Sequence, residues 1–277
     1  MKSPAELLRG ERFKWLTPLK SLLARQLCSP LVGAAAYRAG GGFIRSRGII
    51  VDTRSPEVAH RTRAQLLFGL YEGAEVRFTH RHLAADRTVI ELGSSLGVVT
   101  SHAAAILNPG IQVFGVEANH DLFDLASANI ARNAPGAHVT IFHGAINYEL
   151  EEGETAYLSR EEDHAAARLT HDKSATQTLI APVTTLSKLI ADHGITRYTL
   201  ICDIEGAEVG MFLRETKSLQ LCQQMIIELH DTSFDGRRYP LKELVRMVEA
   251  LGFTVTAQYG GVYVFDRTRS DRDTLMS

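Results

Sequence analysis

The feature of this sequence with the clearest chemical potential is an apolar run that ends in a glycine-rich turn. The run at 89–92 leads into the turn at 93–97, and a helix-like segment begins immediately afterwards. Glycine lets the chain turn tightly and lets a ligand approach the main-chain amides. A second apolar run, 112–117, ends in Glu117, whose carboxylate can accept hydrogen bonds from both hydroxyls of a ribose. The turn and the acid together predict a nucleoside-binding site.

Two nucleoside cofactors compete for this turn, and its spacing separates them. A dinucleotide site favours G-x-G-x-x-G, whereas Gly93 and Gly97 here enclose three residues that begin with Ser94 and Ser95. A sulfonium ligand such as S-adenosylmethionine has no pyrophosphate and benefits from a nearby carboxylate, which Glu91 could supply directly or through water. The spacing therefore favours S-adenosylmethionine over NAD.

Candidates for catalysis follow two later apolar runs, at 198–203 and 223–229. Open α/β sheets bind their ligands beyond the carboxyl ends of the parallel strands, which is where Asp203, Glu205 and His230 fall. We predict His230 as the general base because histidine ordinarily titrates near neutral pH, with Asp203 and Glu205 as further catalytic residues. The alternatives are a backbone-bonding role for His230 and a helix-capping role for Asp203. A divalent metal is a further alternative, which we do not favour, and its ligands would be Asp203, Glu205, Glu228 and His230.

Strand-like and helix-like segments alternate from residue 62 onward, as in α/β layer folds. We predict a seven-stranded, mostly parallel, doubly wound (Rossmann-like) sheet. The last two strands are joined by a short turn, so they form a terminal antiparallel hairpin. The predicted strands lie near 88–93, 112–117, 138–143, 198–203, 223–229, 252–258 and 262–266. The predicted helices lie near 62–71, 97–107, 120–132, 183–193, 206–214 and 240–251.

The first part of the chain differs from the rest in charge. Residues 1–48 carry nine basic and two acidic side chains, a net charge of +7, and leucines recur there at helical spacing. We predict a helical N-terminal extension over 1–60 and a main domain over 61–277. Packing of the extension on the main domain is preferred to contact of residues 1–30 with a membrane surface or a partner. Within the main domain, 148–181 is an insertion or lid that contains short strands near 154–159 and 176–180.

The amino-acid composition indicates which binding partners and which cellular compartment to expect. The chain has 277 residues, of which 45% are apolar, and a formal charge of -2 gives no overall attraction to nucleic acid. Three widely spaced cysteines argue against disulfides and against a thiolate zinc site, so they are expected to be small hydrophobes in a cytoplasmic protein. No transmembrane segment is expected. The histidines at 80 and 82 lack a third spaced ligand and are expected at the surface.

Four stretches of the sequence resemble the FkbM family of class I S-adenosylmethionine-dependent methyltransferases. They are 69–72 (GLYE), the turn 91–97, 116–119 (VEAN) with Asn129 and Asn133 beyond it, and 202–208 (CDIEGAE). The family usually has Asp, Ala and Asn where this chain has Glu91, Ser94 and Ser95. The side chains of Asn129 and Asn133 are expected at the surface, outside the site.

The resemblance implies a fold, a cofactor and a reaction. It implies methyl transfer from S-adenosylmethionine, most often to a hydroxyl of a sugar, glycan or natural product. The implied cofactor site adds Ala118 after Glu117, and Gly144 and Ala145, whose small side chains admit the adenine ring. The full set of expected cofactor-binding residues is Glu91, Gly93, Ser94, Ser95, Gly97, Glu117, Ala118, Gly144, Ala145 and Asp203. Two alternatives are kept: an NAD-dependent oxidoreductase, and a non-catalytic interaction protein that retains the fold.

Overall fold

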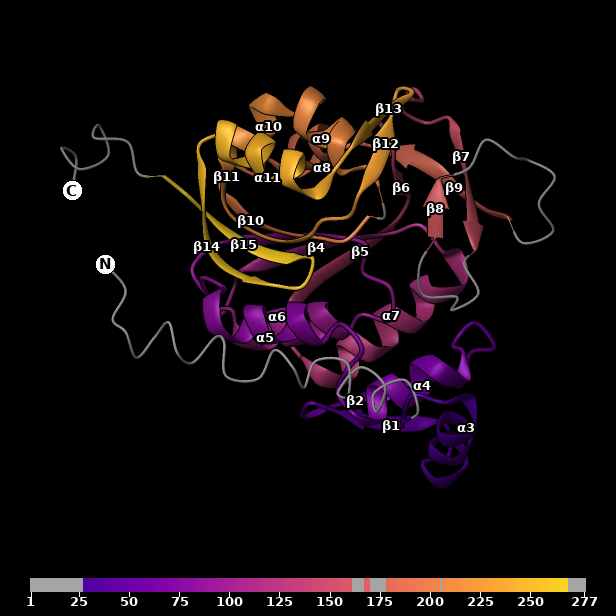
Figure 1. Ribbon diagram of the computed structural model, residues 1–277. Helices are drawn as coiled ribbons and strands as arrows, with labels where there is room; N and C mark the ends of the chain where they lie inside the picture. Colours follow the sequence, from indigo (N-terminus) through magenta and orange to yellow (C-terminus); the bar gives the residue numbers. More distant parts are fainter. Residues whose placement is uncertain (1–26, 161–166, 170–177, 205, 269–277) are drawn as a thin grey trace, which may run out of the picture.

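A seven-stranded sheet forms the centre of the computed structural model, which describes residues 27–160, 167–169, 178–204 and 206–268 (Figure 1). The strand order is β14-β15-β11-β10-β3-β4-β5. The five strands from β11 to β5 are parallel, and β15 runs antiparallel to both β11 and β14. The predicted parallel sheet with a terminal hairpin is therefore confirmed. The strands are β3 (Thr88–Leu92), β4 (Gln112–Glu117), β5 (His138–His143), β10 (Tyr198–Cys202), β11 (Cys222–Glu228), β14 (Phe253–Tyr259) and β15 (Val262–Arg267).

Helices cover both faces of this sheet, which explains why its central strands are apolar along their whole length. All five residues of β10 are buried, as are the last four of β3. One face is covered by α5, α6 and α7, and the opposite face by α8 to α11 (Figure 1). The helices are α5 (Gly73–His82), α6 (Val98–Ile106), α7 (His120–Asn133), α8 (Leu186–His193), α9 (Glu208–Arg214), α10 (Thr216–Leu221) and α11 (Leu241–Ala250). No helix in the described parts is long and apolar enough to cross a membrane.

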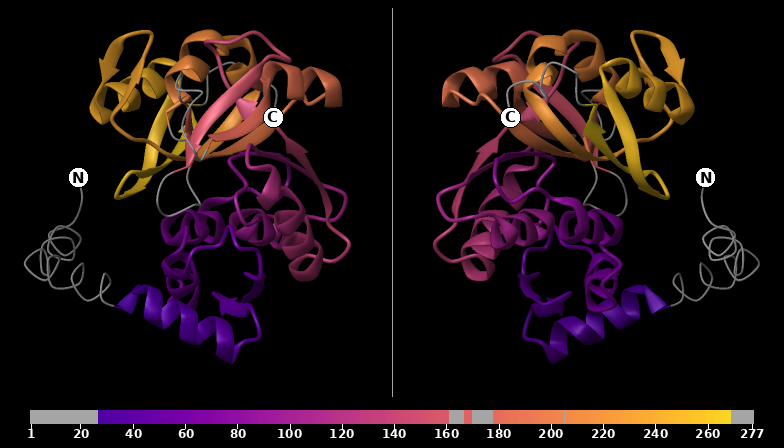
Figure 2. Two further views of the ribbon diagram at one scale, coloured as in Figure 1. Left: turned by 90° about the vertical axis from the view of Figure 1, so that its right-hand side faces the viewer. Right: turned by 90° about the vertical axis from the view of Figure 1, so that its left-hand side faces the viewer.

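The segment before the sheet lies at one end of the molecule, on the side of α5 to α7 (Figures 1 and 2). It contains α3 (Pro30–Ala39), the antiparallel strands β1 (Phe43–Ser46) and β2 (Ile49–Asp52), and α4 (His60–Leu67). A helical extension over 1–60 thus fits α3 but not 43–52, which pair as a hairpin. The short helices expected before residue 27 lie outside the described residues. The domain boundary near residue 60 stays a prediction.

Two asparagines of α7 attach the β1–β2 hairpin to the main body. Asn129 Oδ1 accepts a hydrogen bond from the Asp52 amide at 2.7 Å, and its Nδ2 donates to the Leu96 carbonyl at 3.0 Å. Asn133 exchanges two hydrogen bonds of 2.9 Å with the backbone of Ile50. Asn129 is 1% exposed, so the expectation of a surface side chain is wrong for it. Its partners lie 33 and 77 residues away in sequence, which is why the spacing along α7 did not reveal them.

Replacing Asn129 with alanine is expected to lower the free energy of unfolding by about 3 kcal/mol, because the Asp52 amide and the Leu96 carbonyl would lose a buried partner. Chemical denaturation of both proteins measures this difference. Asn108→Ala is a matched control, since Asn108 is exposed beyond α6, and a change within about 0.5 kcal/mol is expected there. Equal stabilities of the two variants would contradict the anchoring role.

The insertion builds a second, four-stranded sheet with the order β6-β9-β7-β8 (Figure 1). Its strands are β6 (Ala145–Ile146), β7 (Thr155–Arg160), β8 (Ala167–Leu169) and β9 (Thr178–Thr184). The short strands expected near 154–159 and 176–180 correspond to β7 and β9, although 161–166 and 170–177 lie outside the described residues. A further two-stranded hairpin, β12 (Thr232–Phe234) with β13 (Arg237–Tyr239), follows the end of β11.

Several helices differ from the sequence-based expectation, and α10 was not predicted. The helix predicted to reach residue 71 ends at Leu67, because Gly69 adopts a left-handed φ of 63° and its amide turns back to the Leu66 carbonyl. Helix α5 was not predicted. The helix predicted from 183 begins at Leu186, since residues up to Thr184 belong to β9 and Thr185 caps the helix by accepting a hydrogen bond from the Lys188 amide.

Candidate active site

The glycine turn after β3 is held against the ends of two neighbouring strands. The amides of Gly93 and Ser94 both donate to the Val116 carbonyl at the end of β4, at 2.9 and 3.1 Å. Gly93 has a φ of +88°, and a Cβ atom on it would lie 2.1 Å from the Asp203 carbonyl oxygen. Only glycine fits this position, because both the backbone conformation and the space exclude a side chain.

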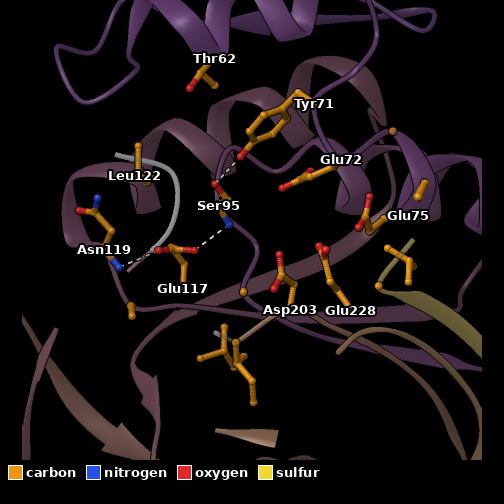
Figure 3. A pocket seen from close by; sticks show the side chains of 18 of the residues that line it. Thr62, Tyr71, Glu72, Glu75, Ser95, Glu117, Asn119, Leu122, Asp203 and Glu228 are labelled. Carbon is orange, nitrogen blue, oxygen red and sulfur yellow. Dashed lines mark hydrogen bonds between the residues drawn. The ribbon is translucent and has the colours of Figure 1, made fainter. Parts of the chain in front are cut away.

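Glu117 links this turn to the start of α7. Its two carboxylate oxygens accept hydrogen bonds from the Ser95 amide at 2.6 Å and the Asn119 amide at 2.7 Å (Figure 3). Glu117 is 7% exposed, and this burial raises its pKa. The hydrogen bonds from these amides oppose the rise. Each carboxylate oxygen keeps a further lone pair, so Glu117 can also accept a hydrogen bond from a ligand hydroxyl.

These residues border a cavity of about 490 Å³ at the carboxyl ends of β3, β4, β10 and β11 (Figure 3). Its volume lies in the range of small-molecule sites. The expected cofactor residues that line it are Gly93, Ser95, Glu117, Ala118, Gly144, Ala145 and Asp203. Those that do not line it are Glu91, Ser94 and Gly97. Seven of the ten expected residues are thus brought together around one space.

The three residues outside the cavity wall contact the elements around the turn. Glu91 is 3% exposed and accepts a hydrogen bond from the Thr100 hydroxyl, and burial raises its pKa to about 8. Ser94 packs against Gly115, where a Cβ atom would lie 2.5 Å from the Ser94 hydroxyl oxygen. Gly97, with a φ of +72°, is the N-cap residue that precedes α6. Glu91 is not part of the cavity lining, and its contact with the cofactor, directly or through water, stays a prediction.

The candidate catalytic residues have different positions. Asp203 lines the cavity beside Glu228, the last residue of β11 (Figure 3). His230 is not part of the cavity lining, and its Nε2 lies 3.3 Å from Glu228 Oε1. The hydrogen bond from His230 holds the pKa of Glu228 below its usual value, although burial opposes this. Glu205 lies outside the described residues, so its role stays a prediction.

Two further acids enter the cavity from the start of α5, and neither of them follows a predicted strand. Burial raises the pKa of Glu72 well above its usual value, and the nearby Glu91, Glu75 and Asp203 raise it further. Burial, followed by the nearby Glu228, raises the pKa of Glu75 to about 7. The GLYE stretch at 69–72 was a signal for Glu72. No sequence signal indicated Glu75, because α5 itself was not predicted.

Other parts of the wall come from elements that the sequence did not connect with the site. Tyr71 shares a hydrogen bond of 2.7 Å with the Ser95 hydroxyl. Helix α4 and the β14–β15 turn also contribute lining residues, which are Thr62, Gln65, Tyr259, Gly260, Gly261 and Val262. Among the described residues, no cluster of three or more histidine, cysteine or acidic side chains has the arrangement of a metal site. The three cysteines are buried and unpaired, as expected.

The sheet order, the glycine turn and the acid after β4 define the class I methyltransferase fold. The family model described as "Methyltransferase FkbM domain" matches residues 91–255. Because this match spans more than half of the chain, the chain belongs to the FkbM family of class I S-adenosylmethionine-dependent methyltransferases. The membership decides between the two cofactor classes considered above, against NAD. No protein of curated function matches the chain.

Solved methyltransferase structures resemble the chain distantly. Magnesium protoporphyrin IX methyltransferase from Synechocystis PCC 6803, with bound SAH, has 10% identity and a TM-score of 0.40 over 71% of this chain and 81% of that chain. A putative O-methyltransferase from Klebsiella pneumoniae has 13% identity and a TM-score of 0.40 over 72% and 79%. A putative RNA methyltransferase from Pyrococcus horikoshii has 13% identity and a TM-score of 0.39 over 74% and 85%.

The residues of the cavity fit S-adenosylmethionine. Gly93 lines the cavity with backbone alone, and Glu117 can accept hydrogen bonds from ribose hydroxyls. Small side chains at Gly144 and Ala145 leave room for a flat ring. The Oε2 atom of Glu72 is buried and accepts no hydrogen bond from the described residues, so it can serve a positively charged group.

Proposed function

We propose that this protein transfers the methyl group of S-adenosylmethionine to a hydroxyl oxygen of a sugar, a glycan or another natural product. The observation that carries this proposal is the pair of carboxyl groups, Glu75 and Glu228, that faces the cavity from α5 and β11 (Figure 3). The cofactor supplies an electrophilic methyl group. A hydroxyl acceptor must lose its proton as its oxygen is methylated, and a carboxylate in the wall can take that proton.

Proton acceptance is assigned to Glu228, with His230 as its positioning residue. Glu228 lines the cavity, whereas His230 lies behind it at 3.3 Å and can orient its carboxylate. As the bond between the acceptor oxygen and the methyl carbon forms and the sulfur–methyl bond breaks, the hydroxyl proton moves to Glu228. The products are a methyl ether and S-adenosylhomocysteine. His230 thus acts on the reaction through Glu228, whereas the sequence analysis predicted His230 itself as the general base.

The rim of the cavity supports a small-molecule acceptor. Leu70 and Tyr259 line the cavity and are 47% and 58% exposed, so an entering ring can pack against them. The described lining contains five acidic residues and no lysine, arginine or histidine. Such a wall repels phosphates, which supports a sugar or natural product as acceptor over nucleic acid. A cytoplasmic location is part of the proposal and is supported by three unpaired cysteines.

Glu228→Gln is expected to lower kcat about 100-fold and to leave the affinity for the neutral product S-adenosylhomocysteine within about twofold, because the variant lacks the proton acceptor but keeps the shape of the side chain. His230→Ala is expected to lower kcat about tenfold, since it removes only a positioning contact. Transfer of labelled methyl groups to a panel of sugars and polyketides, followed by mass spectrometry of the product, measures both effects. Glu249→Gln, an exposed change on α11, is the control.

Undiminished turnover in Glu228→Gln, or products methylated on nitrogen, would contradict the proposal. The non-catalytic alternative has a different signature. It predicts weak or absent cofactor binding, or binding without transfer to any acceptor, and it predicts loss of partner binding when residues 1–30 are removed. The same truncation, tested on anionic vesicles, addresses membrane contact by that segment. A divalent metal is not part of the proposal, and turnover with and without magnesium tests that choice.

A further inference from the structure

The wall of the cavity carries charge of only one sign. Four acidic side chains, Glu72, Glu75, Asp203 and Glu228, surround one region of the cavity, and Glu117 lies further along it (Figure 3). The described lining contains no basic side chain. Charges that are removed from water need a partner of opposite sign, because burial otherwise strongly disfavours the ionised form. Behind the lining, His230 can supply such a partner to Glu228, with its Nε2 atom 3.3 Å from Glu228 Oε1.

Glu72 experiences this imbalance most strongly. Its Oε2 atom is buried and accepts no hydrogen bond from the described residues. The acids that raise its pKa come from three separate elements: Glu91 on β3, Glu75 on α5 and Asp203 after β10. A positive charge placed in the cavity would interact favourably with all of these groups once they are ionised. The titratable groups around the cavity include Tyr71, Glu72, Glu75, Glu91, Glu117, Asp203 and Glu228, with His230 behind Glu228. Behind the lining there are also two guanidinium groups: Arg47, which donates to the Gly69 carbonyl, and Arg77, which lies over the ring of Tyr259.

The two forms of the cofactor differ by one unit of charge. S-adenosylmethionine carries a positive sulfonium, and the product S-adenosylhomocysteine carries a neutral thioether in its place. The remaining groups are the same. Any difference in affinity between the two therefore reports how the wall interacts with that charge and with the methyl group that bears it.

We propose that the carboxylates of this cavity, Glu72 foremost, make it bind positively charged S-adenosylmethionine in preference to its neutral product, so that methyl transfer itself promotes product release. This inference rests on the proposed function, because it requires the cavity to hold the methyl donor. It adds a role for Glu72, which contacts the cofactor space but takes no part in proton transfer.

The preference must depend on pH, and its sign follows from the raised pKa values. At low pH the carboxyl groups with raised pKa values, Glu72 and Glu75, are protonated and uncharged, so they distinguish poorly between the two ligands. As the pH rises through about 7, where Glu75 titrates, the wall gains negative charge and the preference grows. A bound cation also lowers the pKa values of its neighbours, so binding of S-adenosylmethionine releases protons while binding of S-adenosylhomocysteine releases fewer.

Isothermal titration of the full chain with each ligand, at pH 6 and at pH 8, tests the proposal without any acceptor. At pH 8 we expect S-adenosylmethionine to bind at least about tenfold more tightly than S-adenosylhomocysteine, and at pH 6 at most about threefold. Glu72→Gln is expected to reduce the preference at pH 8 to about threefold or less. Glu249→Gln removes one negative charge from the exposed face of α11 and should leave the preference unchanged. Titration in buffers of different ionisation enthalpy gives the proton release.

The measured affinities test the inference and the proposed function separately. Equal affinities for the two ligands in the unaltered chain at pH 8, or a preference that survives in Glu72→Gln, would overturn this inference and leave the proposed function intact. Failure of both ligands to bind would overturn the proposed function as well. If thermal unfolding shows that Glu72→Gln does not fold, Asp203→Asn and Glu75→Gln each test the same field from a different element, and a preference unchanged in both would overturn the inference.

Discussion

Gly93→Ala is expected to weaken the binding of S-adenosylmethionine by at least about 100-fold, a loss of about 2.7 kcal/mol. The new methyl group would lie 2.1 Å from the Asp203 carbonyl oxygen, closer than any van der Waals contact allows. Hydrogen bonds hold the backbone at both positions. The Gly93 amide donates to the Val116 carbonyl at the end of β4, and the Asp203 amide donates to the Leu92 carbonyl at 3.0 Å. The turn must therefore move, and the cofactor site moves with it.

A matched control separates this clash from backbone strain. Gly110 has a φ of +85°, nearly the same as the +88° of Gly93, but a Cβ atom on it would meet nothing within 4 Å. Gly110→Ala should therefore carry only the conformational cost of a left-handed alanine, about 1–2 kcal/mol of stability. Calorimetric titration with the cofactor, combined with thermal unfolding, compares the two variants. Cofactor binding at full strength in Gly93→Ala would show that the turn does not form the site.

Glu117→Gln is expected to weaken cofactor binding roughly 30- to 100-fold, or about 2–3 kcal/mol. The carboxylate of Glu117 accepts from two backbone amides at once, at Ser95 and at Asn119. A glutamine offers only one oxygen, so its amino group must face one of these N–H donors. The change thus disturbs the turn and also weakens the acceptor available to the ribose hydroxyls.

The binding measurement for Glu117→Gln needs a test of specificity. Glu228→Gln makes the same chemical change at another acid of the cavity and is expected to keep the affinity for S-adenosylhomocysteine within about twofold. Calorimetric titration of both variants with S-adenosylhomocysteine removes any contribution from the sulfonium charge. An affinity of Glu117→Gln within threefold of that of the unaltered chain would mean that the acid after β4 does not hold the nucleoside.

The seven strands of the central sheet could be predicted because their signal is local. A strand covered on both faces must be apolar, as the fully buried β10 is. The predicted segments 112–117 and 138–143 agree with β4 and with the edge strand β5 to the residue. The glycine turn was equally visible, since a left-handed backbone and close packing both require glycine. The final hairpin followed from the short connection between β14 and β15.

The features that could not be predicted depend on contacts between distant parts of the chain. Helix α5 consists largely of polar residues, and it carries Glu75, which is 8% exposed because it faces the cavity. Asn129 was expected at the surface because α7 alone gives no sign that β2 packs against it. In both cases a polar side chain is buried by a partner that the local pattern does not reveal.

The sequence alone determined the fold class, the family and the position of the cofactor turn, because all three depend on short-range patterns of apolar residues and glycines. The tertiary structure decided which polar groups share a site. It separated Glu91 and His230 from the cavity wall, and it brought Glu72 and Glu75 to the ends of β10 and β11, beside Asp203 and Glu228. The physical reason is that burial and electrostatic coupling arise from packing in three dimensions. The strongly acidic character of the cavity therefore emerges only when these strands and α5 are assembled.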